Sequence, residues 1–106
     1  MNSAFSAAID RLWSRFLPEI RERVGILENA AKDAAAGRLD NAACMAANSA
    51  AHKLAGVLGT FGLTRGTVLA RELEVIYART DGPDEGSTRR LGEIAVELRA
   101  MVESRK

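Results

Sequence analysis

Two residues whose side chains can act as nucleophiles occur once each in this chain, His52 and Cys44. On a helix, their eight-residue separation turns them about 80° apart, at 100° per residue, so they do not form a cysteine–histidine catalytic pair. One histidine and one cysteine also do not make a zinc site. Because free cysteine behaves as a small buried hydrophobe, we expect Cys44 to be a packing residue within the alanine-rich run NAACMAANSA.

The apolar residues around His52 recur at helical spacing and define one face. His52 lies about 160° from the centre of that face, so we expect its imidazole to point into solvent, where a partner can reach a titratable nucleophile. The alternative is an incidental surface histidine. The core face spans about 60° to either side of its centre and comprises Ala47, Ala50, Ala51, Leu54, Val57, Leu58 and Phe61.

Glycines follow His52 on its own surface, with Gly56 one turn beyond and Gly59 nearly two turns beyond, both within about 40° of it. Each costs about 1 kcal/mol relative to alanine inside a helix, so its presence needs a reason. A bare patch that lets another molecule approach the ring is one reason; a bend, or close approach by a neighbouring helix, is the other, and spacing leaves both open. We also assign Met45, Asn48 and Ser49, on the turns before His52, to the candidate surface.

Several chemistries are excluded by what the sequence lacks. It has no Gly-rich phosphate loop with its Lys-Ser/Thr, and no acidic cluster with the spacing of a calcium loop. We therefore expect no cofactor, metal or ATP site in the chain, and any phosphate on His52 must come from another protein. A hydrolase built on Ser49 and His52 lacks an orienting acid and an evident oxyanion site.

Helical periodicity runs through the whole sequence. We expect a short leading helix with a stripe of Phe5, Ile9, Leu12 and Phe16 that stops at Pro18. A second helix should run from Pro18 to Gly37, a good left-handed cap. Asp40 should cap a third helix that continues through His52 to about Gly62.

The rest of the chain predicts two more helices around an exposed loop at residues 80–87. The first is marked by Leu69, Leu73, Ile76 and Tyr77, and the second should be capped by Ser87. The apolar positions of that last helix are Leu91, Ile94, Ala95, Leu98, Met101 and Val102. We predict an all-α fold, an antiparallel four-helix bundle with an additional short N-terminal helix over one end.

With 106 residues, the chain fits one domain spanning 1–106. Its 15 basic and 14 acidic residues give a net charge of +1, so we expect neither nucleic-acid nor membrane binding. The absence of a membrane-length apolar run and the single cysteine favour a cytoplasmic location. The alternative is that the leading segment, with Phe5, Trp13 and Phe16, binds a membrane surface. Its polar face has only two basic residues, which is few for such a helix. The initial methionine and the ending ESRK suggest a free protein or a trimmed domain.

The segment AHKLAGVLGTFGL resembles the histidine-containing phosphotransfer (HPt) domain family, and a leucine and a Leu-Glu pair in the next helix extend the likeness. The motif positions are His52, Leu54, Gly56, Gly62, Leu69, Leu73 and Glu74. Many members have a lysine three residues after the histidine, where this chain has Ala55. The nearby Lys53 either leans toward a phosphoryl group, meets an acidic rim of the partner, or is simply solvated.

The resemblance implies a phosphoryl carrier without ATP chemistry of its own. His52 would take the group from a receiver aspartate or a histidine kinase and pass it to a receiver that holds Mg²⁺, with the neutral imidazole as nucleophile. A free imidazole, with a pKa of about 6.5, is mostly neutral at pH 7. We expect a monomer with Leu58 and Phe61 in the core and Leu63 in the core or at the docking edge. The alternative is a docking module that binds a receiver or kinase domain and is never phosphorylated.

Overall fold

The computed structural model describes residues 3–79 and 82–105. Over these residues the elements are α1 (Ser3–Ala35), α2 (Asn41–Thr60), α3 (Thr64–Tyr77) and α4 (Glu85–Ser104). Every regular element in this part of the chain is a helix, which confirms the predicted all-α fold.

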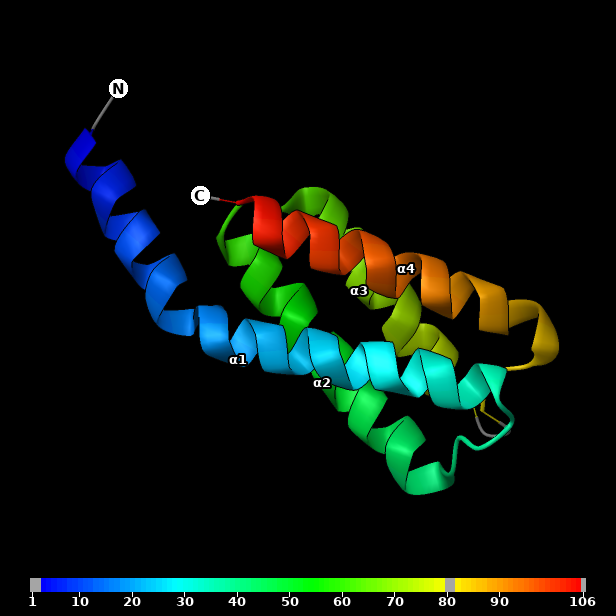
Figure 1. Cartoon of the computed structure of the whole chain (residues 1–106). Coiled ribbons are helices and arrows are strands. Elements are labelled where there is room, and N and C mark those ends of the chain that lie inside the picture. The colour runs from blue at the N-terminus through cyan, green and yellow to red at the C-terminus, as the bar shows by residue number, and fades with distance from the viewer. Residues whose placement is uncertain (1–2, 80–81, 106) are drawn as a thin grey trace.

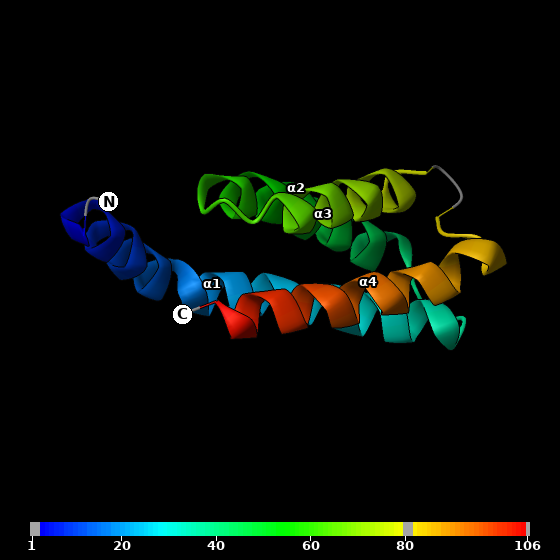
Figure 2. The same cartoon turned by 90° about the horizontal axis from the view of Figure 1, so that it is seen from above.

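The helices form two layers around one core. Figure 2 shows α2 beside α3 in one layer and α1 beside α4 in the other. Contacts between α1 and α2 and between α3 and α4 join the layers, and successive helices run in opposite directions (Figure 1). Burying one large aliphatic side chain stabilises the fold by about 1.5–3 kcal/mol, so the fully buried residues are the main source of stability. They are Ile20, Val24, Leu27, Leu54, Leu58, Leu69, Leu73, Leu91, Ile94, Leu98 and Val102.

The predicted break at Pro18 is wrong, because α1 is one helix with Pro18 inside it. Proline inside a helix removes a backbone hydrogen bond and crowds the preceding turn, and the helix can continue past it with a bend. In Figure 1 the first part of α1, in dark blue, is bent away from the line of the rest. There is therefore no separate N-terminal helix over residues 3–35.

Tertiary contacts hold the first part of α1 in place across the proline. The Trp13 ring packs edge-on against Phe61 at the end of α2, with ring centroids 5.1 Å apart, and the Arg105 guanidinium lies 4.8 Å from the Trp13 ring centroid. Trp13 is buried, whereas Phe5 and Leu12 of the predicted apolar stripe are exposed. The contacts of Trp13 and Phe16 with Phe61 hold this segment against the end of α2.

Helix ends follow the predicted caps at two of three places. The Asp40 carboxylate accepts a hydrogen bond from the Ala43 backbone N–H at 2.7 Å, and Gly37 has a left-handed φ of 70°. The predicted cap at Ser87 is wrong, because the Asp84 carboxylate accepts the Ser87 N–H at 2.8 Å and α4 begins at Glu85. An acceptor three residues earlier captures the free N–H first, so residues 85–87 are helical rather than loop. Residues 80 and 81 of the predicted loop lie outside the described residues.

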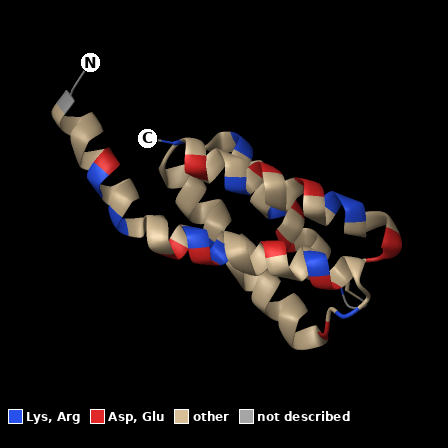
Figure 3. Cartoon of the chain, in the orientation of Figure 1, with Lys and Arg blue, Asp and Glu red and all other residues tan. Residues whose placement is uncertain are grey.

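Charged residues are unevenly distributed over the helices. Figure 3 shows them along α1 and α4, where ion pairs join the two helices, such as Arg99 with Glu28 at 2.7 Å and Arg21 with Glu103 at 2.7 Å. On α2, Lys53 stands alone among uncharged residues and His52. Among the described residues, no helix is both long and apolar enough to cross a bilayer.

Candidate functional site

His52 projects from the middle of α2 with 70% of its side chain exposed. This confirms the predicted direction, because the opposite face of the helix is the one that packs. Ala47, Ala50, Ala51, Leu54 and Leu58 are buried there, while Val57 and Phe61 are partly buried against the same core.

A carboxylate from the next helix holds the imidazole. Nδ1 of His52 lies 2.8 Å from Oε2 of Glu74 on α3. An ionised carboxylate only accepts hydrogen bonds, so we assign the proton of the neutral ring to Nδ1. The free lone pair is then on Nε2, which is left as the nucleophilic atom of an exposed ring.

Two further hydrogen bonds fix α3 against α2, one on each side of His52. The Asn48 amide nitrogen donates to the Glu74 carbonyl at 2.7 Å, and the Thr67 hydroxyl donates to the Ala55 carbonyl at 3.0 Å. Asn48, assigned to the site from sequence, thus holds the backbone of the residue that holds His52.

The two glycines have different structural reasons. A Cβ on Gly59 would lie 3.2 Å from the Thr67 hydroxyl oxygen, so Gly59 serves the close approach of α3. A Cβ on Gly56 would meet nothing within 4 Å. Helix packing therefore explains Gly59, and Gly56 leaves open surface one turn from His52.

The remaining candidates from α2 form no contact with the His52–Glu74 pair among the described residues. Ser49 and Lys53 line a groove on the α1 side together with Glu19, Glu22 and Arg23 of α1. Met45 is 65% exposed, and its sulfur contacts the Asn41 side chain at 3.9 Å. The structure thus brings His52 and Asn48 together with Glu74, leaves Gly56 open one turn beyond His52, and places Ser49 and Lys53 in the groove on the α1 side.

Sequence reasoning did not assign Glu74 to the site. Its signal was the Leu73-Glu74 pair of the family motif, but nothing in the local sequence connects this carboxylate to a ring 22 residues earlier. The structure also explains the departure at Ala55, which is 3% exposed beneath α3. Leu58 is buried as predicted, and Phe61 and Leu63 are partly buried against the core.

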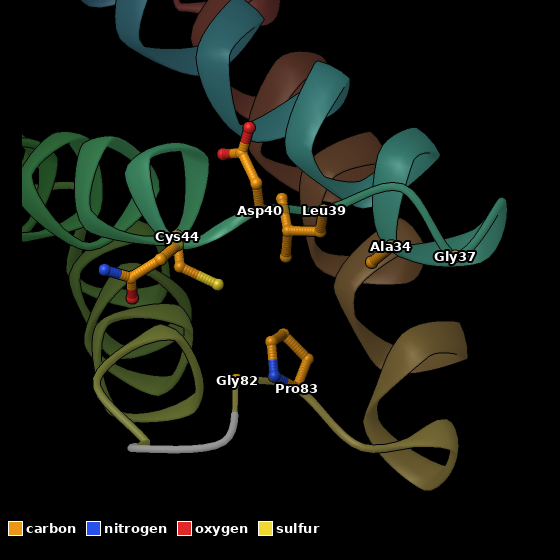
Figure 4. A pocket seen from close by; sticks show the side chains of 8 residues that line it. Ala34, Gly37, Leu39, Asp40, Cys44, Gly82 and Pro83 are labelled. Atoms are coloured by element: carbon orange, nitrogen blue, oxygen red, sulfur yellow. The ribbon is translucent and has the colours of Figure 1, made fainter.

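A hollow at the other end of α2 offers no comparable chemistry. Figure 4 shows Leu39 and Pro83 facing each other across it, with the Cys44 sulfur directed toward it. Burial and the nearby Asp40 carboxylate raise the pKa of the Cys44 thiol, so this cysteine packs and does not act as a thiolate. Among the described residues there is no cluster of three His, Cys, Asp or Glu that could hold a metal ion.

Comparison of the sequence with known proteins identifies the family of the chain. The model of the Hpt domain family matches residues 11–105. Protein RcaC of Microchaete diplosiphon is 37% identical over 70 residues, which cover 66% of this chain and 11% of that relative, so the chain corresponds to a small part of a much longer protein. No solved structure gives a match. Hpt domains carry a phosphoryl group on histidine in two-component phosphorelays, between kinase and receiver domains, and the chain belongs to this Hpt domain family.

Proposed function

We propose that this domain relays a phosphoryl group through Nε2 of His52, between a histidine kinase or a receiver aspartate and the receiver domain of a response regulator. The observation that carries the proposal is the exposed imidazole whose Nδ1 is held 2.8 Å from the Glu74 carboxylate. That contact fixes the ring's tautomer and orientation, which leaves one nitrogen available for transfer.

The transfer step follows from this geometry. The Nε2 lone pair attacks phosphorus, the N–P bond forms, and the P–O bond to the donor aspartate breaks with its electron pair leaving on that carboxylate. The ring gains positive charge while Nδ1–H still points at Glu74, whose negative charge stabilises it. The reverse sequence passes the group to the next receiver.

The surface around His52 suits the approach of a receiver active site. We define the docking face as the exposed short residues of α2 on both sides of His52 along the helix: Gly56 and Thr60 after it, and Ala46 and Ser49 before it at the edge of the groove on the α1 side. With no side chain at position 56 and open space there, a partner's aspartate can come within bonding distance of Nε2. We propose that the partner supplies the Mg²⁺, and that this domain acts as a cytoplasmic monomer without an ATP site of its own.

The test is phosphotransfer from a labelled, phosphorylated receiver with Mg²⁺, comparing the wild type with His52→Gln. Acid-labile, alkali-stable label on the wild type alone supports the carrier role. Binding of several receivers or kinase domains without any label would instead indicate the docking module that is never phosphorylated.

A further inference from the structure

One exposed arginine of α3, Arg71, lies about one turn of helix before Glu74. Arg71 of α3 is exposed, and it forms no hydrogen bond or ion pair with any described residue. It precedes Glu74 by three residues, which places it about one turn away and about 60° further round the helix. The side chain of Arg71 therefore leaves α3 on the same side as the Glu74 carboxylate that holds the ring.

The hydrogen bonds between α2 and α3 show which turn of α2 lies beside Arg71. Glu74 lies opposite His52, and Thr67 lies opposite Ala55. Arg71 is between Glu74 and Thr67 on an antiparallel neighbour, so it is level with the turn of α2 that runs from His52 to Ala55. Gly56 directly follows that turn, and a Cβ there would meet nothing within 4 Å, so the surface at the end of the turn is open.

A positive charge near His52 would stabilise its phosphorylated form. A phosphoryl group brings about two negative charges at neutral pH, and here it joins a ring already bonded to the Glu74 carboxylate. Two other nearby cations are occupied or turned away: Arg79 pairs with Asp84 at 3.1 Å, and Lys53 faces the groove shared with Glu19 and Glu22.

We propose that the Arg71 guanidinium binds the phosphoryl oxygens of phosphorylated His52 across the α2–α3 seam. This rests on the proposed function. Guanidinium presents paired N–H donors that match phosphate geometry, and its charge offsets the repulsion between the phosphoryl group and Glu74. Arg71 thus stabilises the phosphorylated form, and the buried Ala55 has no part in it.

The first test uses the protein alone, phosphorylated with phosphoramidate, a small donor that needs no partner. The ³¹P signal of phosphohistidine titrates with pH, and removing a nearby cation makes protonation easier. We expect the titration midpoint to rise in Arg71→Ala, to return toward the wild-type value in Arg71→Lys, and to stay unchanged in Arg89→Ala. Arg89→Ala is the matched control, because Arg89 is an exposed arginine of α4, away from the α2–α3 seam.

The second test measures the equilibrium between the phosphorylated receiver and phosphorylated His52. Loss of a charge-assisted phosphate contact at an exposed site should shift this equilibrium about fivefold away from His52 in Arg71→Ala. Identical ³¹P midpoints and equilibria for Arg71→Ala and wild type would overturn the role of Arg71. Failure of wild-type His52 to accept label from any donor would instead overturn the proposed function.

Discussion

His52 and Glu74 come from different helices, yet Nδ1 of the one lies 2.8 Å from Oε2 of the other. The packing of α3 on α2 therefore determines that Nε2, and not Nδ1, is the ring nitrogen without a partner among the described residues. Asn48 reinforces the choice by bonding to the Glu74 backbone carbonyl.

Replacing Glu74 should slow transfer without unfolding the domain. A hydrogen bond to a charged group contributes about 1.5–3 kcal/mol, and partial exposure puts this one at the low end, so Glu74→Ala should lose about tenfold in transfer rate. Glu74→Gln keeps an acceptor and should lose less. Quenched-flow transfer from a labelled receiver measures both. Glu72→Ala, which removes a partner of Arg90 instead, is the control; a wild-type rate in Glu74→Ala would refute the orienting role.

Substitutions at Gly56 should separate stability from transfer. Gly56→Ala places a methyl group in open space and removes a helix-interior glycine, so the free energy of unfolding should rise by up to about 1 kcal/mol. Gly56→Arg should fold but block transfer by crowding the docking face. Gly92→Arg, at another open glycine on α4, is the matched control and should transfer normally. Urea denaturation and the transfer assay report the two effects, and normal transfer by Gly56→Arg would show that close approach does not need the bare surface.

Gly59→Ala should behave differently from Gly56→Ala. The new methyl group would press on the Thr67 hydroxyl, so the gain in helix propensity, about 1 kcal/mol, should be cancelled or reversed. A double-mutant cycle with Thr67→Ala should reveal positive coupling, because the smaller residue makes room. Unfolding free energies for the four proteins test this, and simple additivity would show that the α2–α3 contact at this point is not tight.

Acid should weaken the join between α1 and α4. The hydrogen bond from Arg99 lowers the pKa of Glu28 below its ordinary value. The pair therefore adds stability above the unfolded-state pKa of about 4.3, and this is lost as pH falls through the lower folded-state value. Between about pH 5 and pH 3, the unfolding free energy of wild type should fall more steeply than that of Glu28→Gln. Equal slopes in urea titrations would mean that the pair does not contribute.

The Cys44 thiol should resist modification in the native protein. Burial raises its pKa, and the side chain lies in the core cluster, so reaction with a disulfide reagent at pH 8 should be far slower than in denaturant. A rate close to that of the unfolded chain would show that the hollow at Leu39 and Pro83 opens to solvent.

Much of the fold follows from local signals, and the exceptions have tertiary causes. Asp40 and Gly37 act as sequence patterns predict, because capping and left-handed turns involve residues a few positions apart. Pro18 misleads because the contact that keeps the helix going across it, Trp13 on Phe61, joins positions far apart in sequence. At the start of α4, Asp84 and Ser87 are both good N-cap residues and lie three positions apart, and the local sequence does not show which of them begins the helix.

The residues of the site likewise fall into those that local spacing predicts and those that depend on tertiary packing. Helical spacing alone places His52 outward and Gly56 beside it. Glu74 appears in sequence only as part of a motif, since its role depends on the register of α3 against α2. Gly59 could not be told from Gly56 by spacing, because only the position of Thr67 distinguishes them.

The short side chains of the docking face have a consequence for binding entropy. Association normally costs about 0.5–1.5 kcal/mol for each flexible side chain that an interface immobilises. Alanine and glycine have no such freedom to lose, and the small Ser49 and Thr60 have little. Under the proposed function, a receiver that contacts these four residues would therefore immobilise little side-chain freedom, which lowers the entropic cost of a brief complex.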